Sequence, residues 1–373
     1  MLTRDTLGII FANMHENSVR EMTQERSMAS LPFGGRYRLV DFTLSAMVHA
    51  GISQVGIVTK NNYQSLVDHI GSGRDWDLAR RRGISILSPY SYTSSEGNMA
   101  FHGRIEALYA VRDFIEHSSS DLVLLADTDH ICSPDISDII DKHISTGADV
   151  TMVCRDPDPD PENVSNCISV RCGEDGTVND IMINKYDENY LQSMNIMVIG
   201  RLKLLELIAD ASAHAKTFFE RDILLEHINE LKVVAYRYTD YVRRITGLRS
   251  YYNISLELTD PEKTSKLFGK QIIYTKVHDS PPVRYSIGCD VRNSFVADGC
   301  TIEGTVENCV LFRDVVIEKG AVVRNSVIMQ NTHVCAGADL ECVVTDKDVT
   351  VTSGKKLAGD PEYPLYIKKK SVV

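Results

Sequence analysis

The sequence predicts a chain of two domains, in which a doubly wound, Rossmann-like α/β domain precedes a left-handed parallel β-helix of hexapeptide repeats. Three observations support this prediction. The 373 residues exceed the usual size of one domain. Short apolar runs alternate with helical patterns up to about residue 258, and an aliphatic residue then recurs at every sixth position. We therefore expect the α/β domain at 1–258, a linker at 259–283 and the β-helix at 284–373.

The first domain is expected to consist of alternating strands and helices. Its strands are expected at Leu7–Ala12, Val55–Thr59, Leu122–Ala126, Thr177–Ile183, Asn195–Val198 and Val233–Tyr236. Its helices are expected at Val40–Ala50, Ile105–Ile115, Ile136–Ser145, Leu202–Ala209, Phe218–Leu231 and Leu248–Leu258. Ligands of doubly wound sheets bind beyond the carboxyl ends of the strands. The chemistry is therefore expected in the segments that follow Ala12, Thr59 and Ala126.

The second domain is predicted from a six-residue period. The aliphatic positions of this period are Val310, Val316, Val322, Ile328, Val334 and Leu340, with Val296 and Ile302 on a shifted register. Each six-residue side of a triangular coil turns one aliphatic residue inward, so we expect these side chains to form the core. Such coils have exposed ends and flat faces that pack on partners. An oligomer is therefore expected, formed by identical chains when the protein is alone.

Composition excludes several classes of protein. A formal net charge of −11 disfavours binding to nucleic acid, and no apolar run is long enough to span a membrane. The nine cysteines are odd in number and include no Cys-x-x-Cys pair, which argues against a zinc site and against a disulfide framework. The expected location is a reducing cytoplasm.

One segment carries a specific family resemblance. The sequence LPFGGRYRLVDFTLS at 31–45 places the pair Gly34-Gly35 before Asp41, which physically indicates a turn followed by a capped helix. It also resembles the PFGGxxRxxDFxLSN segment of bacterial ADP-glucose pyrophosphorylases (glucose-1-phosphate adenylyltransferases). The likeness continues, in the same order, through 63–70, 76–80, 86–90, 129–131 and 193–195 and into the β-helix. It implies a nucleotidyltransferase-like first domain.

The resemblance implies a reaction in which glucose 1-phosphate and ATP give ADP-glucose and pyrophosphate, but the triphosphate site is degenerate. The family has a glycine-rich GGxGxRL loop after its first strand, whereas residues 13–20 of this chain read NMHENSVR, without glycine. Met28 stands where the family's RAKPA motif has lysine. Remnants of the nucleotide site are expected at Gly34, Gly35 and Gly103, the last from a GTADA-like motif.

The family's metal site is half present. Asp129 matches the aspartate of the GDHIY motif, while Arg244 replaces the second carboxylate, which lies in the WRDVGTLxxY motif. One carboxylate beside a fixed cation is a poor Mg²⁺ site. Asp129 thus remains a candidate metal ligand, with a strand-end turn residue as the other interpretation.

Other candidate sites concern phosphate. Lys185 matches the lysine of the family's FVEKP motif and Ser193 matches the SMG motif, which implies a sugar-phosphate site. Four arginines could bind a phosphorylated effector through bidentate contacts, with ordinary solvated surface as the alternative. They are Arg20, Arg26, Arg36 and Arg38.

The losses concentrate where phosphoryl chemistry would occur, and in this the chain resembles the GlgD-type subunit of glycogen biosynthesis. That resemblance implies a regulatory subunit, silent or weakly active, that needs no cofactor of its own. It also implies a heterotetramer with a catalytic GlgC-type subunit, which would bind Mg²⁺. The alternatives are an active sugar-phosphate nucleotidyltransferase with an atypical triphosphate site and, more remotely, a hexapeptide acyltransferase using His333 as general base.

Overall fold

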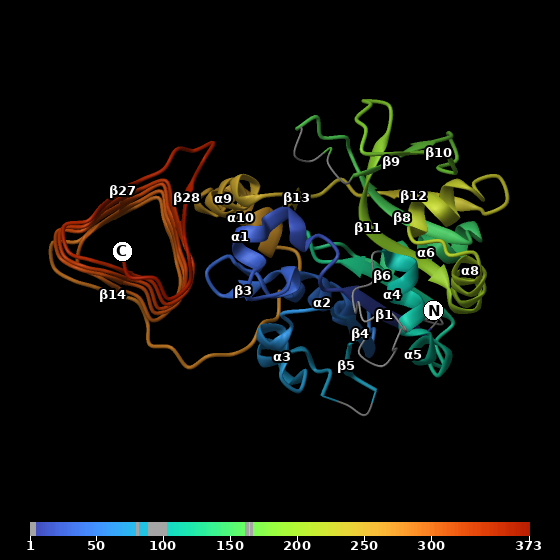
Figure 1. The fold of residues 1–373 in the computed structure, drawn as a ribbon, viewed down its shortest axis with the longest axis horizontal. Helices are drawn as coiled ribbons and strands as arrows, with labels where there is room; N and C mark the ends of the chain where they lie inside the picture. Colours follow the sequence, from blue (N-terminus) through green and yellow to red (C-terminus); the bar gives the residue numbers. More distant parts are fainter. Residues whose placement is uncertain (1–4, 80–81, 89–102, 161–163, 165–166) are drawn as a thin grey trace. The chain divides into compact units, whose positions relative to one another are not determined.

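The computed structural model describes residues 5–79, 82–88, 103–160, 164 and 167–373, which divide into two compact units (Figure 1). The first unit comprises 1–16, 26–30 and 42–244, and the second comprises 17–25, 31–41 and 245–373. The division therefore falls near residue 245, whereas the sequence pattern suggested 258. Two N-terminal segments also join the second unit, and one contact of this kind is the hydrogen bond from the hydroxyl of Tyr251 to the carbonyl of Pro32 at 2.8 Å.

A nine-stranded mixed sheet forms the centre of the first unit. Seven strands run in the order β10-β9-β11-β6-β1-β4-β5, and β8 and β12 continue the sheet from β11. Their bounds are β1 (Thr6–Phe11), β4 (Gln54–Val58), β5 (Ile84–Leu87), β6 (Leu122–Asp127), β8 (Val150–Arg155), β9 (Ile168–Cys172), β10 (Val178–Ile183), β11 (Leu191–Gly200) and β12 (Val233–Arg237). Strands β1, β4, β5 and β6 are parallel, while β11 runs antiparallel to β6.

Helices cover both faces of this sheet, as a doubly wound fold requires. They are α2 (Leu39–His49), α3 (Gln64–Ile70), α4 (Arg104–Ala110), α5 (Arg112–Glu116), α6 (Ile136–Thr146) and α8 (Arg201–Ala213). Leu7, Ile9 and Phe11 share one core cluster with apolar residues of α4 and α8. Gly8 faces the other way, because a Cβ added there would lie 2.7 Å from the sulfur of Met47 in α2.

Two predicted helices differ from those observed. The helix expected at Ile105–Ile115 is two short helices, α4 and α5, which meet at Val111. The helix expected at Phe218–Leu231 contains a π-helical segment, Glu220–Leu225, whose wider turn lies next to the site described below. Parts of the motifs at 76–80 and 86–90 lie outside the described residues.

The second unit contains the β-helix, seen end-on as a triangle in Figure 1. Three parallel five-stranded sheets form its sides, in the orders β14-β17-β20-β23-β26, β15-β18-β21-β24-β27 and β16-β19-β22-β25-β28. The strands are β14 (Arg284–Tyr285), β15 (Asp290–Arg292), β16 (Phe295–Val296), β17 (Thr301–Ile302), β18 (Thr305–Glu307), β19 (Val310–Leu311), β20 (Val316–Ile317), β21 (Val322–Arg324), β22 (Val327–Ile328), β23 (His333–Val334), β24 (Asp339–Glu341), β25 (Val343–Thr345), β26 (Thr350–Val351), β27 (Lys356–Ala358) and β28 (Leu365–Ile367). The fold class predicted from the hexapeptide period is confirmed.

The inward register of the coil differs from the predicted one at three positions in its middle part. Ile328, Val334 and Leu340 lie in the interior as expected, and so do Val296 and Ile302. At the three earlier positions, however, the residue that enters the interior core is the next one along the chain: Leu311, Ile317 and Val323 in place of Val310, Val316 and Val322. Each of these steps offers two adjacent aliphatic residues, so the six-residue period alone could not decide between them.

Shorter elements complete the second unit. They are α1 (Arg20–Thr23), the hairpin of β2 (Pro32–Phe33) and β3 (Tyr37–Arg38), α9 (Leu248–Leu256) and α10 (Pro261–Phe268). The rings of Tyr37 and Phe268 stack with their centroids 5.2 Å apart. One corner of the last coil is enlarged. Residues 359–364 separate β27 from β28, the strand that pairs with β25, and 360–363 are exposed. No helix within the described residues is long and apolar enough to cross a membrane.

Candidate functional site

The carboxyl ends of β1 and β6 bring together a cluster of charged side chains in the first unit. The two strands are parallel neighbours with Phe11 opposite Asp127, so the segments that follow them leave the sheet side by side. The segment after β1 supplies His15, and β6 with its extension supplies Asp127 and Asp129. This is the sheet edge at which the sequence predicted chemistry.

Ion pairs to side chains of this chain occupy both aspartates. Asp127 Oδ2 lies 2.8 Å from His15 Nε2 and accepts a hydrogen bond from Arg104 at 2.9 Å. Asp129 Oδ2 accepts a hydrogen bond from Arg244 Nε at 2.9 Å and lies 3.7 Å from His15 Nε2. Arg104 also donates to Glu220 at 2.5 Å. Three carboxylates thus face two guanidiniums and one imidazole.

The antiparallel pair β7 (His130–Cys132) and β13 (Val242–Arg244) explains why Arg244 meets Asp129. Arg244 is opposite His130 in this pair, directly beside the aspartate. The side chains of Asp129 and Arg244 are 0% and 5% exposed. The ion pair is therefore buried, and the pairing of β7 with β13 fixes the position of Arg244 beside Asp129.

The surroundings of His15 and Asp129 favour the charged form of each side chain. Burial alone would lower the pKa of His15, but Asp129 and Asp127 outweigh it and raise this pKa above the ordinary 6.5. Burial would raise the pKa of Asp129, but His130, His15 and Arg244 hold it well below its usual range. Protonated His15 and ionised Asp129 therefore stabilise each other.

His130 behaves in the opposite way. Burial lowers the pKa of its imidazole below 6.5, against the influence of Asp129, and Arg244 adds to the lowering. Its Nδ1 lies 2.8 Å from Asp129 Oδ1, so the neutral ring donates from Nδ1. Its Nε2 is buried without a hydrogen-bond partner among the described residues, as is Asp127 Oδ1.

A bulge in β11 completes the cluster. The pairing of β11 with β8 shifts register between Ser193 and Ile196, and Asn195 takes a left-handed conformation with φ of 57°. Bulges of this kind redirect a side chain. Here the amide nitrogen of Asn195 comes within 3.4 Å of His15 Nε2.

The cluster is a poor match for Mg²⁺. His15, Asp127 and Asp129 have donor atoms within 4.8 Å of one another, as a metal site requires. However, Asp127 Oδ2 and Asp129 Oδ2 already accept hydrogen bonds from Arg104 and Arg244 at 2.9 Å each. Asp127 Oδ1 is the one oxygen of the two aspartates without a hydrogen-bond partner among the described residues. Mg²⁺ prefers an octahedral shell of oxygen ligands, and two fixed guanidiniums at hydrogen-bond distance would repel it.

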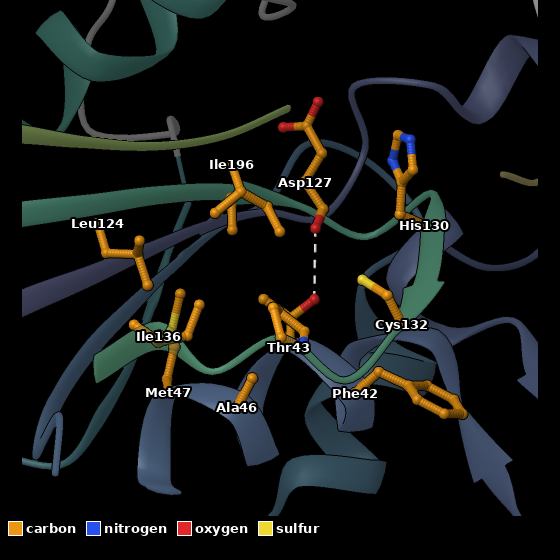
Figure 2. Close-up of a pocket in the computed structure, with 12 residues that line it drawn as sticks. Phe42, Thr43, Ala46, Met47, Leu124, Asp127, His130, Cys132, Ile136 and Ile196 are labelled. Carbon is orange, nitrogen blue, oxygen red and sulfur yellow. Dashed lines mark hydrogen bonds between the residues drawn. The ribbon is translucent and has the colours of Figure 1, made fainter. Parts of the chain in front are cut away.

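The small cavity beneath the cluster has no room for a nucleotide or a sugar (Figure 2). Its volume is about 10 Å³, enough for about one water molecule. Thr43 Oγ1 donates to the main-chain carbonyl of Asp127 across this cavity at 3.3 Å. The carboxylate of Asp127 and the ring of His130 point away from the apolar side chains that line it.

Of the residues singled out in the sequence, the structure joins Asp129 and Arg244 directly. Met28 is buried at 1% exposure in the first unit. Gly103 immediately precedes α4, where a Cβ would lie 2.1 Å from the carbonyl oxygen of Thr217, so packing alone requires a glycine there. Gly34 and Gly35 form the β2–β3 turn with φ of 57° and 77°, and both belong to the second unit.

The predicted phosphate-binding residues are dispersed. Lys185 is exposed after β10, while Ser193 is 6% exposed and its hydroxyl accepts a hydrogen bond from Asn195 N at 3.1 Å. Among the four arginines, Arg26 is buried in the first unit. The other three belong to the second unit, where Arg36 lies 3.5 Å from Asp298. A sugar-phosphate site and an effector pocket both remain predictions.

Four residues of the cluster are not predicted by the sequence patterns, namely His15, Arg104, Asp127 and Glu220. Asp127 could have been found, because it precedes Asp129 by two residues at the end of one strand and therefore shares its side. Arg104 directly follows Gly103 in the altered nucleotide motif. His15 and Glu220 carry no local signal, since only the fold brings them to the aspartates.

Comparison with known proteins agrees with this architecture. A family model described as "Nucleotidyl transferase" matches residues 9–180, and one described as "GlmU-like, C-terminal hexapeptide" matches residues 284–364. These matches define the class: a nucleotidyl transferase domain joined to a hexapeptide β-helix.

Individual relatives identify the family within this class. Glycogen biosynthesis protein GlgD of Bacillus subtilis (strain 168) is 32% identical over 370 residues, covering 99% of this chain and 97% of the relative. Glucose-1-phosphate adenylyltransferase of Pseudothermotoga lettingae is 35% identical over 86% of this chain and 76% of the relative. GlgD of Geobacillus stearothermophilus is 35% identical over 85% and 82%. The chain therefore belongs to the glucose-1-phosphate adenylyltransferase family, together with the GlgD glycogen biosynthesis proteins.

Proposed function

We propose that this chain is a regulatory, catalytically silent subunit of glucose-1-phosphate adenylyltransferase in glycogen biosynthesis. The observation that carries the proposal is the pairing of Asp127 and Asp129 with Arg104, Arg244 and His15. Phosphoryl transfer between two anions needs cations placed on the reacting phosphates. In this cluster the cationic groups are committed to carboxylates of the same chain.

The charges of the cluster balance without a metal ion, and this balance is the reason why we expect no catalysis. The carboxylates of Asp127, Asp129 and Glu220 are matched by two guanidiniums and protonated His15, so the cluster is close to neutral without any metal ion. Mg²⁺ would have to displace Arg244 and Arg104 from buried positions, and breaking a buried ion pair costs about 3–5 kcal/mol. This chain accordingly needs no cofactor, and Mg²⁺ is bound by the catalytic partner.

The proposed partner is a catalytic subunit of the same family, joined with this chain in a heterotetramer. Regulation requires only that this chain bind an effector or a sugar phosphate with different affinity in two states of the assembly. The likeness to a GlgD glycogen biosynthesis protein, 32% identical over 99% of this chain, supports this role.

The test is formation of ADP-glucose from ATP and glucose 1-phosphate with Mg²⁺. It compares this chain alone, a catalytic partner alone, their mixture, and a mixture in which the partner carries a substitution that abolishes its activity. We expect no turnover by this chain alone or with the inactive partner, and an altered rate or effector response with the active one. Turnover by this chain alone, or by its mixture with the inactive partner, would show that this chain is an enzyme in its own right. An unchanged rate and effector response of the active partner would exclude regulation.

A further inference from the structure

A second cluster of potential ligands lies on the β-helix, within the second unit and separate from the aspartate cluster. It comprises Glu318, His333 and Cys335, whose ligand atoms all lie within 4.8 Å of one another. His333 Nε2 is 2.8 Å from Glu318 Oε1, and the two side chains are 43% and 37% exposed. Water and ions therefore reach the cluster from solution.

The register of the coil explains why the three side chains converge. Strand β20 pairs with β23, so that Val316 lies opposite His333 and Ile317 opposite Val334. Continuing the register places Glu318 opposite Cys335 on the next coil, one strand spacing of about 4.8 Å away. His333 and Cys335 are two residues apart in an extended segment, so both point to the same side. Val334, between them, points into the core.

The turn that follows β23 holds the carboxylate in place. The backbone N–H of Ala336 donates to Glu318 Oε2 at 2.7 Å, which leaves Oε1 directed toward His333. Gly337 in this turn has φ of 72°, and the nitrogen of Gly337 lies 3.9 Å from the position of a Cβ on Gly320 in the preceding coil. The turns thus repeat closely from coil to coil, which makes the support of the carboxylate rigid.

Electrostatics separate this cluster from the aspartate cluster. Within the described residues, the ion pair of Glu318 is with His333, and neither lysine nor arginine pairs with this carboxylate. The thiol of Cys335 makes no hydrogen bond within the same part of the chain, and the cysteine is free and half-buried. All three groups are thus available as ligands without breaking a pair to a fixed cation.

We propose that Glu318, His333 and Cys335 form a Zn²⁺ site on the outer face of the β-helix. Carboxylate oxygen, imidazole nitrogen and thiolate sulfur are each ligands of Zn²⁺ in proteins. A set with a single cysteine needs no Cys-x-x-Cys pair, whose absence argued against a zinc site in the sequence. Three protein ligands leave the fourth tetrahedral position to water. This site goes beyond the proposed function and does not depend on it.

The geometry needs only small adjustments. Zn–N and Zn–O distances of about 2.0–2.2 Å place two tetrahedral ligand atoms about 3.4 Å apart. The present 2.8 Å between His333 Nε2 and Glu318 Oε1 must therefore open by roughly half an ångström. On binding, the thiol loses its proton to solvent and the imidazole presents the lone pair of Nε2, so no oxidant or reductant takes part.

The experiment is a titration of the tag-free, reduced and chelator-treated full chain with Co²⁺, followed by absorbance. Tetrahedral Co²⁺ bound to thiolate gives a sulfur-to-metal charge-transfer band. We expect one equivalent to bind and Zn²⁺ to displace it. Cys335→Ser removes the band, and His333→Ala and Glu318→Gln each weaken binding by at least about tenfold. Cys289→Ser is the matched control, since Cys289 is also half-buried in the coil, and it retains the band.

Thermal unfolding supplies a second readout. Zn²⁺ should raise the melting temperature of the wild-type chain and of Cys289→Ser, but not that of Cys335→Ser. Without metal, Cys335→Ser should melt close to the wild-type chain, because the Cys335 thiol makes no hydrogen bond within the described residues and is not part of the interior core. The proposal is overturned if the wild-type chain gives no charge-transfer band, or if the band survives Cys335→Ser.

Discussion

At the scale of single residues, Arg244 decides the character of the aspartate cluster. Its guanidinium takes the position beside Asp129 at which the family resemblance implies a second carboxylate, and it is buried there. A cation that is part of the chain cannot be exchanged with solvent, unlike a metal ion. The cluster is therefore stable without metal.

Replacing Arg244 by an acidic residue should make the stability of the protein depend on Mg²⁺. We expect Arg244→Asp to destabilise the fold by about 3–5 kcal/mol, because two carboxylates then share a buried site. Mg²⁺ should recover part of this loss by bridging them, and it should leave the wild-type chain unchanged. Urea unfolding with and without Mg²⁺ measures both effects. Arg243→Asp, on the half-buried neighbour, is the control, and an equal response to Mg²⁺ in both variants would contradict the argument.

Restoring two family residues should not restore catalysis. Met28→Lys combined with Arg244→Asp leaves the segment 13–20 without glycine and leaves His15 against Asp127. We expect ADP-glucose formation by this double variant to stay at the background level. A rate approaching that of the catalytic partner would mean that the loop after β1 is no obstacle.

His15 and His130 should give the stability of the protein opposite dependences on pH. The raised pKa of His15 means that its contribution is full below pH 6.5 and is lost as pH rises through its folded-state value. The lowered pKa of His130 means that its contribution is present above pH 6.5 and is lost as pH falls.

Melting curves of His15→Gln between about pH 5 and 9 test this sign. The difference in melting temperature from the wild-type chain should be largest at the acidic end and should shrink as pH rises. His130→Gln should show the reverse trend, with its largest difference at the alkaline end. The exposed His117→Gln provides a control for general effects of losing an imidazole. Parallel trends for His15→Gln and His130→Gln would refute the assignment.

At the scale of elements, the β-helix shows what a period can and cannot predict. The six-residue beat predicted the architecture, because inward aliphatic residues recur once per side of the coil. It misplaced the interior residues in the middle of the coil, since Val316-Ile317 and Val322-Val323 present two aliphatic residues at one step. Strand pairing across successive coils, which joins Val316 to His333, settles the choice and is invisible locally.

A matched pair of substitutions tests this register. Ile317 is fully buried in the coil, whereas its neighbour Val316 is half-buried on the outer side. We expect Ile317→Ala to cost about 2–5 kcal/mol, as for other core truncations, and Val316→Ala to cost less than about 1 kcal/mol. Denaturant unfolding measures the two. Equal losses of stability would instead support the register predicted from the sequence, in which Val316 points inward.

At the scale of the whole molecule, the sequence predicted the fold class and the edge of the sheet that carries the charged cluster. Alternating strands and helices determine where the carboxyl ends of strands lie, so the segments after β1 and β6 could be singled out. The partners of Asp129 could not be derived in the same way. Arg104, Glu220 and His15 come from distant segments of the chain. Glu220 begins the π-helical segment, and His15 follows β1 and lies beside Asn195 in the bulge of β11.

A ligand measurement on the intact protein addresses the sugar-phosphate prediction. We expect glucose 1-phosphate to raise the melting temperature of the full chain by mass action, and ATP with Mg²⁺ to have no such effect. Lys185→Ala should remove the shift, while Lys203→Ala, a change of a half-buried lysine of α8 that pairs with Glu206, should keep it. Stabilisation by Mg²⁺ and ATP would instead indicate an intact nucleotide site.

The enlarged corner between β27 and β28 has a further consequence for the design of variants. Each coil pairs with the next through fixed partners, so one residue added within a side would displace every later pair. The last coil already accommodates residues 360–364 outside this pairing, with 360–363 open to solvent. A fluorophore or an affinity peptide inserted there would lengthen an existing loop and leave the pairing of the stacked strands intact. Such a label could then report on assembly with other subunits.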